Sequence, residues 1–176
     1  MDGEKMNWEW LPINWEAVLA IITTIYTLLI FVTLLYVRKQ VKEAAEGRTV
    51  QISFAIFNEL ENEEVRIARR YLYETVPEDI AGLPDEKVKQ HLEACARALV
   101  AFDIVGYLLW QEYLDPDPIL ALYWSAIWKC WKRGEKLIKW ARVKRGDPTH
   151  LTMFQHLFHI SDAHRQANEY AEPRFY

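Results

Sequence analysis

Cysteine is scarce in this chain of 176 residues, because only Cys95 and Cys130 are present and they lie far apart. The dense cysteine spacing of a secreted disulfide framework is therefore absent, and we expect two buried, reduced thiols. Strand patterns, internal repeats and low-complexity tracts are also absent from the sequence. Apolar residues recur at helical spacing along most of the chain, so the predicted fold class is all-α.

The sequence also lacks the short motifs that identify common enzyme classes. It has no GxSxG, no P-loop, no glycine-rich dinucleotide turn and no CxxC. Asp103, in the middle of an apolar stretch, could be a catalytic carboxylate. We favour a structural acid that is satisfied by Arg69, Arg70 or Arg142, because an unpaired buried charge is costly. We therefore expect no enzymatic activity, no catalytic residue and no cofactor.

One long apolar run dominates the sequence. Residues 17–37, AVLAIITTIYTLLIFVTLLYV, contain no charged residue and no proline. At about 1.5 Å per residue, a helix of this length crosses a hydrocarbon core of about 30 Å. A cleaved signal peptide is disfavoured, because the run is too long and its positive charges follow it. We predict a transmembrane helix here.

The flanks of the apolar run differ in charge. Residues 1–16 contain four acidic residues, one lysine and three tryptophans, which suit the boundary between lipid and water. Arg38, Lys39 and Lys42 follow the run. The positive-inside rule then places the amino terminus outside and the bulk of the chain in the cytoplasm. The sequence thus predicts a single-pass protein of the cell (inner or plasma) membrane, in contact with membrane lipids.

The predicted organisation has five parts. They are an interfacial lead over 1–16, the transmembrane helix over 17–37, a juxtamembrane stalk over 38–48, a cytoplasmic helical-bundle domain over 49–170 and a tail over 171–176. The stalk continues the helix as far as Gly47, where glycine costs about 1 kcal/mol relative to alanine. Asn62 and Asp85 are predicted to cap two helices of the domain, and the LDPD turn at 114–117 to separate two more.

Small residues form a stripe along the predicted transmembrane helix, at Ala17, Ala20, Thr24 and Thr27. Such a stripe lets a second helix approach closely, which favours association in lipid. The alternative is that alanine and threonine are merely tolerated at these positions. On the first interpretation the protein is a homo-oligomer or part of a larger membrane complex.

Charge is unevenly distributed, since residues 59–93 are rich in acids and 129–145 are almost purely basic. The basic segment also carries tryptophans at steps of four and three. Together they define a candidate site for an anionic ligand or lipid, namely Trp124, Trp128, Trp131, Lys129, Lys132, Lys136 and Lys139. Such a surface suits an anionic leaflet, a nucleotide or single-stranded nucleic acid, or an acidic patch of another subunit. An amphipathic helix with its tryptophans in the core is the competing interpretation.

Histidines and one cysteine at helical spacing suggest a metal site. His91 and Cys95 are four residues apart, and His156 and His159 are three apart, so the four could in principle bind zinc tetrahedrally. Cys95, however, lies on an apolar stripe with helical spacing, and neither pair belongs to a known motif such as HExxH. The stripe consists of Val88, Leu92, Cys95, Leu99, Phe102, Gly106 and Leu109. We therefore expect no bound metal.

Several short stretches resemble a known family. They are ARRYLYE at 68–74, AFDIVGYLL at 101–109, the LDPD turn, Trp128 and Arg142. These residues resemble a bacterial family registered as domain of unknown function 4760, many of whose members carry an amino-terminal membrane helix. The resemblance covers roughly residues 48–167. It implies a helical cytoplasmic domain attached to one membrane span, and it brings no established activity.

The sequence supports three hypotheses from different functional classes. The leading one is a non-enzymatic single-pass membrane protein whose domain mediates self-association or docking onto a membrane complex. The alternative is a ligand-responsive membrane effector that binds an anionic messenger or nucleotide through the basic, tryptophan-bearing helix. A metal-dependent hydrolase is the third, and it requires the zinc site. We do not expect nucleic acid as a partner.

Overall fold

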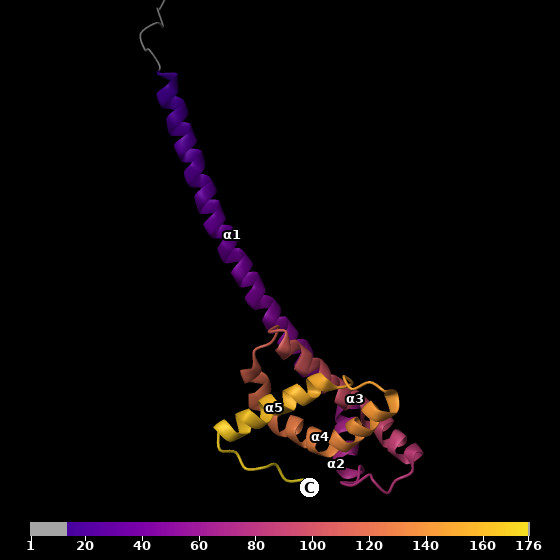
Figure 1. Ribbon diagram of the computed structural model, residues 1–176. Helices are drawn as coiled ribbons and strands as arrows, with labels where there is room; N and C mark the ends of the chain where they lie inside the picture. Colours follow the sequence, from indigo (N-terminus) through magenta and orange to yellow (C-terminus); the bar gives the residue numbers. More distant parts are fainter. Residues whose placement is uncertain (1–13, 176) are drawn as a thin grey trace, which may run out of the picture. The chain divides into compact units, whose positions relative to one another are not determined.

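The computed structural model describes residues 14–175 of the chain, and these contain helices and no strand. The helices are α1 (Trp15–Leu60), α2 (Glu63–Glu74), α3 (Asp85–Trp110), α4 (Pro116–Arg145) and α5 (Thr152–Ala167), as Figure 1 shows. The predicted all-α class is confirmed. The chain forms two compact units, Met1–Gly47 and Arg48–Tyr176, and we call the second the helical domain.

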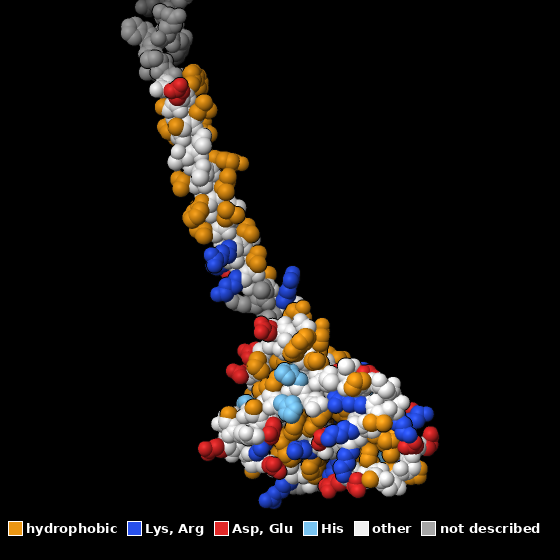
Figure 2. All heavy atoms as spheres, viewed as in Figure 1, with side chains coloured by type: hydrophobic (Ala, Val, Ile, Leu, Met, Phe, Trp, Pro, Cys, Tyr) orange, Lys and Arg blue, Asp and Glu red, His pale blue; other side chains and the backbone are white. Residues whose placement is uncertain are grey.

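The first unit contains the apolar part of α1. The segment Trp15–Ala44 has a mean hydropathy of 2.5 in its most apolar window, none of which is buried within the protein. Hydrophobic side chains cover its surface (Figure 2). The hydroxyls of its threonines donate to backbone carbonyls four residues earlier, so they need no outside partner; these residues are Thr23, Thr24, Thr27 and Thr33. The segment is therefore long and apolar enough to cross a membrane.

Gly47 lies inside α1, although the sequence predicted that the first helix would end near Gly47 and that a second would begin at Thr49. The first helix instead continues from Trp15 to Leu60. A glycine lowers helix stability by only about 1 kcal/mol, which the hydrogen bonds on either side offset. The last turns of α1 belong to the helical domain, where Ile56 and Leu60 are buried.

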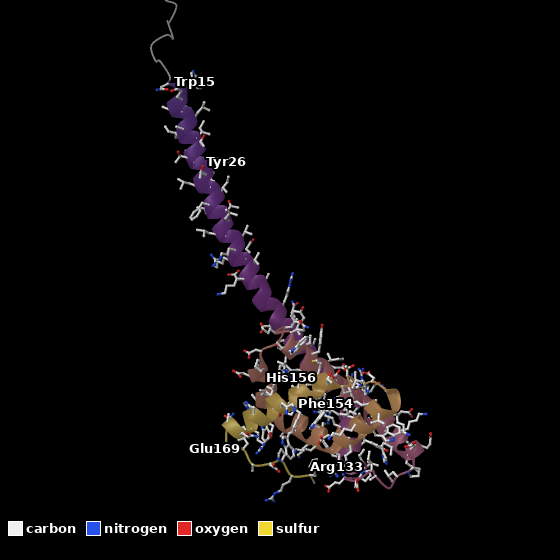
Figure 3. All side chains as sticks on the ribbon, viewed as in Figure 1. Trp15, Tyr26, Arg133, Phe154, His156 and Glu169 are labelled. Atoms are coloured by element: carbon white, nitrogen blue, oxygen red, sulfur yellow. The ribbon has the colours of Figure 1, made fainter. Side chains whose placement is uncertain are left out.

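The helical domain is organised around α3, which packs against α2, α4 and α5. Its predicted apolar stripe is confirmed, because every residue of the stripe is buried: Val88, Leu92, Cys95, Leu99, Phe102, Gly106 and Leu109. Phe102 stacks on Phe154 of α5 with 5.4 Å between ring centroids, and neither is accessible to solvent. Phe154 is labelled in Figure 3. These two rings mark the centre of the core.

Two predicted helix caps have different outcomes. Asn62 caps α2, since its side-chain oxygen accepts the N–H of Glu64 at 2.9 Å. The prediction for Asp85 was wrong, because Pro84 precedes α3 and Asp85 is its first residue. The Asp85 carboxylate instead accepts from Lys144 and from Trp140 Nε1 of α4, which hold its pKa below the usual range. The start of α3 thus lies beside the end of α4, and the two helices are antiparallel.

The link from α4 to α5 is held by side chains of neighbouring helices. Gly146 ends α4 with a left-handed backbone at φ +63°, a conformation that glycine adopts without strain. Arg142 Nε then donates to the carbonyl of His150 at 2.8 Å, and its Nη1 donates to Gln155 Oε1 at 3.0 Å. Asp103 of α3 accepts the N–H of Phe154 at 2.8 Å. The first turn of α5 is therefore fixed by both α3 and α4.

Candidate functional site

The three tryptophans predicted to contact a ligand have different environments. Trp131 is 4% exposed and packs between Phe154 and Phe158, so it belongs to the core and the prediction for it is corrected. Trp124 stacks on Tyr170 at 5.1 Å. Trp128 is 5% exposed and its Nε1 donates to Asp162 at 3.1 Å, but one edge of its ring lines a cavity. Most of the side of α4 that carries the tryptophans therefore packs in the core, because large rings bury the most apolar area.

The four lysines of α4 that were predicted to bind a ligand also differ. Lys136 Nζ pairs with Asp79 at 3.1 Å, and Lys139 Nζ pairs with Glu135 at 2.7 Å. Lys132 Nζ lies 5.3 Å from the centroid of the Trp128 ring, and no carboxylate among residues 14–175 pairs with it. Lys129 lines a smaller cavity. Ion pairs therefore neutralise part of the predicted row of lysines. The charge of Lys132 is more available to an anion than the charges of Lys136 and Lys139.

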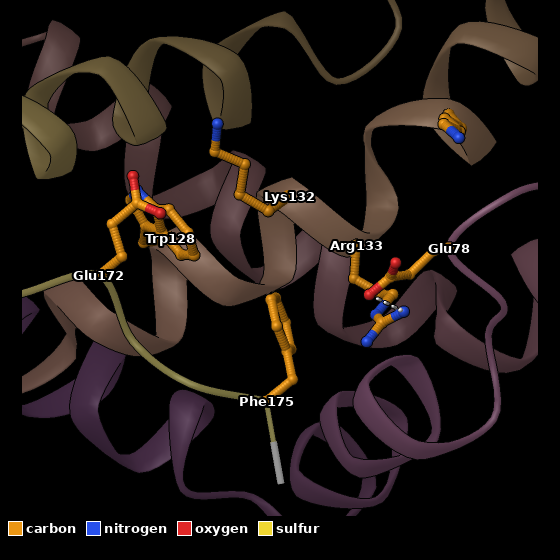
Figure 4. Close-up of a pocket in the computed structure, with 7 residues that line it drawn as sticks. Glu78, Trp128, Lys132, Arg133, Glu172 and Phe175 are labelled. Carbon is orange, nitrogen blue, oxygen red and sulfur yellow. Dashed lines mark ion pairs between the residues drawn. The ribbon is translucent and has the colours of Figure 1, made fainter.

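A cavity of about 360 Å³ lies beside Trp128 (Figure 4). This volume falls at the lower end of the range of about 300–1,000 Å³ that is usual for small-molecule sites. Cationic and aromatic side chains from α4 meet the α2–α3 loop and the C-terminal segment around it. The lining residues are Glu78, Trp128, Lys132, Arg133, Lys136, Glu172 and Phe175.

Two further cavities are linked to the first through shared lining residues. Phe175 lines both the first cavity and one of about 120 Å³, to which Tyr73, Glu74 and Lys129 contribute. Tyr73 and Glu74 also line a third cavity, of about 230 Å³, with three arginines of α2, Arg66, Arg69 and Arg70. We call the three together the cationic groove. Seven cationic and three acidic side chains line it.

Tyr73 connects α2 to α4 at the base of the cationic groove. Its hydroxyl donates to the carbonyl of Ala126 at 3.3 Å and lies 3.2 Å from Cys130 Sγ. Burial raises the pKa of the Tyr73 hydroxyl well above its usual value and that of the Cys130 thiol to about 12. Both groups therefore stay protonated at neutral pH, and the groove wall carries no negative charge at this point.

Arg133 is the most deeply placed cation of the cavity beside Trp128. Its side chain is 12% exposed, and Nη1 pairs with Glu78 Oε1 at 3.3 Å. The Phe175 ring covers the guanidinium, with 4.6 Å from Cζ to the ring centroid. Arg133 Nε is buried and has no hydrogen-bond partner in the described part of the chain. A buried donor without an acceptor costs about 1–3 kcal/mol, so this N–H favours any anion that reaches it.

Two of the three arginines predicted to neutralise Asp103, Arg69 and Arg142, bind other groups. Arg69 Nη2 donates to the carbonyl of Leu60, at the end of α1, and Arg142 holds the α4–α5 link as described above. Asp103 is satisfied by a backbone N–H at the start of α5, where a carboxylate is favoured by the partial positive charge of the helix terminus. Asp103 thus contacts backbone where the sequence predicted an arginine, and the contact is a structural one.

The four weak metal-ligand candidates are not assembled into a site. Among residues 14–175, no group of three or more histidine, cysteine, aspartate or glutamate side chains is placed to hold a metal ion. His91 Nδ1 is hydrogen-bonded to the Tyr71 hydroxyl at 3.0 Å, whereas His156 and His159 are exposed on α5. Burial raises the pKa of the Cys95 thiol to about 12, which disfavours the thiolate that zinc requires.

A second surface feature is an apolar strip on the side of α3 that faces away from the core. Its residues are between 42% and 56% exposed and recur at steps of four, three and three, namely Val100, Ile104, Tyr107 and Trp110. We call this strip the α3 face. A cavity of about 100 Å³ adjoins it at Val100 and is lined mainly by apolar side chains.

Sequence reasoning missed the α2 side of the cationic groove and its C-terminal part. Arg66, Arg69 and Arg70 recur at steps of three and one, which places them on one side of a helix. That spacing predicts a basic side on the helix that carries these arginines, but it does not indicate that this helix packs next to α4. Phe175 falls in the segment that the sequence predicted to be a tail.

Comparison with known proteins adds no assignment, since no protein-family model, no curated protein and no solved structure matches this chain. The resemblance to domain of unknown function 4760 therefore stays a prediction that rests on the residues given for it.

Proposed function

We propose that this chain is a membrane-anchored helical protein whose domain binds a small anionic ligand in the cationic groove. The observation that supports this proposal is the concentration of charge. Seven cationic side chains against three acidic ones line the groove, in a chain whose formal net charge is −4. Carboxylates outside the lining pair with Arg66, Arg69 and Lys136. Arg70 and Lys132 have no carboxylate partner among the described residues. Cations gathered in a concave surface with low-dielectric walls focus the electrostatic potential and attract anions.

The anchor in this proposal is the segment Trp15–Ala44 of α1. Arg38, Lys39 and Lys42 follow its apolar core, and the positive-inside rule then places the helical domain in the cytoplasm. In that compartment phosphorylated and carboxylated metabolites are the abundant small anions available to the groove. Ligand binding would act on the protein only if two states of the domain differ in their affinity for the ligand.

Neutralising the groove is expected to weaken anion binding by the full-length protein. The test variant carries Arg70→Gln, Lys132→Gln and Lys136→Gln, which removes three charges from the lining and leaves the core intact. Hydrogen bonds from cations to an anion contribute about 1.5–3 kcal/mol each, so affinity for pyrophosphate should fall by at least about tenfold. Isothermal titration in neutral-lipid nanodiscs at moderate salt measures the affinity.

The matched control removes three lysines that do not line the groove, with Lys87→Gln, Lys89→Gln and Lys139→Gln. Its net charge equals that of the test variant, and its affinity should stay close to that of the unaltered protein. Equal losses in both variants would show that pyrophosphate responds to overall charge only. Binding to anionic vesicles without any binding of pyrophosphate would assign the groove to lipid and contradict the small-ligand proposal.

The α3 face favours a second candidate function, self-association of two copies. Exposed apolar strips of this kind on a folded domain are typical of interaction surfaces. A second copy is the occupant we propose, because membrane anchoring holds identical chains in one plane and raises their effective concentration. The predicted small-residue stripe at Ala17, Ala20, Thr24 and Thr27 would add helix packing, since the threonine hydroxyls are already bonded to their own helix.

Charging the α3 face is expected to convert the protein to a monomer. Ile104→Glu and Tyr107→Glu place two carboxylates at an interface that a second copy would desolvate, which is strongly unfavourable. The control, Leu122→Glu with Val143→Glu, alters two exposed apolar residues outside the face. Light scattering in mild detergent, corrected for bound detergent, gives the protein mass. A monomeric mass for the unaltered protein would contradict self-association.

A further inference from the structure

The C-terminal segment lies across the cationic groove and inserts one ring into it. Phe175 stands between Trp128 and Arg133 in Figure 4, with 6.4 Å between the Phe175 and Trp128 ring centroids. Its ring also lies 4.6 Å from the Arg133 guanidinium carbon. Phe175 thus lines both the cavity of about 360 Å³ and the cavity of about 120 Å³.

The segment is held by polar contacts at Tyr170. Tyr170 stacks on Trp124, and its N–H and carbonyl both bond to Arg165, at 3.0 and 3.3 Å. Within the described residues, no hydrogen bond or ion pair is made by residues 171–174. Between Tyr170 and Phe175 the segment can therefore leave the groove without breaking polar contacts. Among the described residues, opening costs the contacts of Phe175 with Trp128 and Arg133.

We propose that Phe175 occupies the place of the aromatic group of a ligand, so that the groove takes a planar aromatic anion of the nucleoside phosphate class and residues 171–175 form a strap which that ligand displaces. This inference rests on the proposed anion-binding function. A ligand ring would take over the position of Phe175 beside Trp128, which leaves the Arg133 guanidinium to the phosphate of the ligand. This phosphate would also lie near Lys132, for which no carboxylate partner is found among residues 14–175.

The unsatisfied N–H of Arg133 favours ligand binding to the state in which the strap has left the groove. With Phe175 in place, Arg133 Nε is buried and finds no acceptor in the described residues. Opening the strap uncovers the guanidinium edge, and a phosphate oxygen could then accept from Nε while Nη1 keeps its pair with Glu78. The ligand thus satisfies a donor that the strap leaves unsatisfied. This difference between the two states is what allows a ligand to shift their populations.

Three probes separate the contributions of ring and charge: AMP carries both, inorganic phosphate carries only the charge, and adenosine carries only the ring. Titrations use the full-length protein in neutral-lipid nanodiscs. Phe175→Ala should bind AMP about tenfold more tightly than the unaltered protein, because AMP no longer competes with a cation–π contact. Phe175→Tyr keeps the ring and should match the unaltered protein. Affinity for phosphate should change less than affinity for AMP, and adenosine should bind most weakly.

Cleavage by trypsin after Arg174 reports the strap itself, with loss of the last two residues followed by mass spectrometry. AMP should accelerate this cleavage in the unaltered protein. AMP binding without acceleration, or AMP affinity unchanged by Phe175→Ala, would overturn the strap and leave the anion-binding proposal standing. Binding of phosphate and AMP with equal affinity would overturn the aromatic class of ligand. If none of the anions binds, the proposed function itself fails.

Discussion

A variant with two aspartates in the apolar segment of α1 should no longer remain in the membrane fraction. Ile25→Asp and Leu28→Asp lie in the middle of Trp15–Ala44. On insertion scales each exchange of a large apolar residue for aspartate at a helix centre shifts the free energy by about 3–4 kcal/mol, and two shift it by about 6–8 kcal/mol. The expected result is full extraction of the variant from membranes by alkaline carbonate, while the unaltered chain stays in the pellet.

The control for this experiment places the same two charges on the helical domain, with Leu122→Asp and Val143→Asp. Both positions are exposed, at 70% and 81%, so the fold should tolerate them. The control is expected to remain in the pellet like the unaltered chain. Extraction of the unaltered chain itself would show that the apolar segment does not anchor the protein.

Gly106→Ala should destabilise the helical domain by about 3 kcal/mol, the upper end of the usual cost of overpacking. A Cβ at this position would collide with the backbone of Met153 in α5, since the Met153 carbonyl oxygen and carbon are its nearest neighbours. Backbone cannot move aside as a flexible side chain can, so α3 and α5 would have to separate. Urea unfolding followed by circular dichroism measures the loss as a lower midpoint.

Gly134→Ala is the matched control, because Gly134 is also a buried glycine within a helix. The nearest atom to its added Cβ would be a methyl carbon of Leu99 at 3.2 Å, at the end of a side chain that can rotate. Alanine also favours the helix by about 1 kcal/mol over glycine. We expect its unfolding midpoint to stay near that of the unaltered protein. A midpoint for Gly106→Ala equal to that of Gly134→Ala would contradict the close approach of α5.

Much of the fold follows from the sequence because its signals are local. The apolar stripe of α3 is complete from Val88 to Leu109, and the side chain of Asn62 caps α2 as predicted. Asp85 shows where local signals fail. An aspartate after a proline is a reasonable helix cap by sequence. The Asp85 carboxylate instead accepts hydrogen bonds from Trp140 and Lys144, which are more than fifty residues away in the chain. Such a partner depends on how α3 and α4 are placed.

The candidate site depends on that placement even more. The basic character of α4 is visible in the sequence, and Trp128 with Lys132 does line a cavity. The sequence cannot show that the arginines of α2 face the same groove, since residues 66–70 and 128–136 meet only in the folded domain. The sequence also cannot show that Trp131 packs against Phe154 and Phe158, because helical periodicity does not indicate which apolar face lies deepest in the core.

The two thiols provide an internal measure of how often the helical domain opens. Cys95 on α3 and Cys130 on α4 are both inaccessible to solvent, and burial raises the pKa of each to about 12. Alkylating reagents react with the thiolate, so neither side chain reacts until its helix opens to solvent. The rate of alkylation at each cysteine therefore reports the opening equilibrium of that helix. Equal rates would show that α3 and α4 open as one cooperative unit, and unequal rates would identify the helix that opens first.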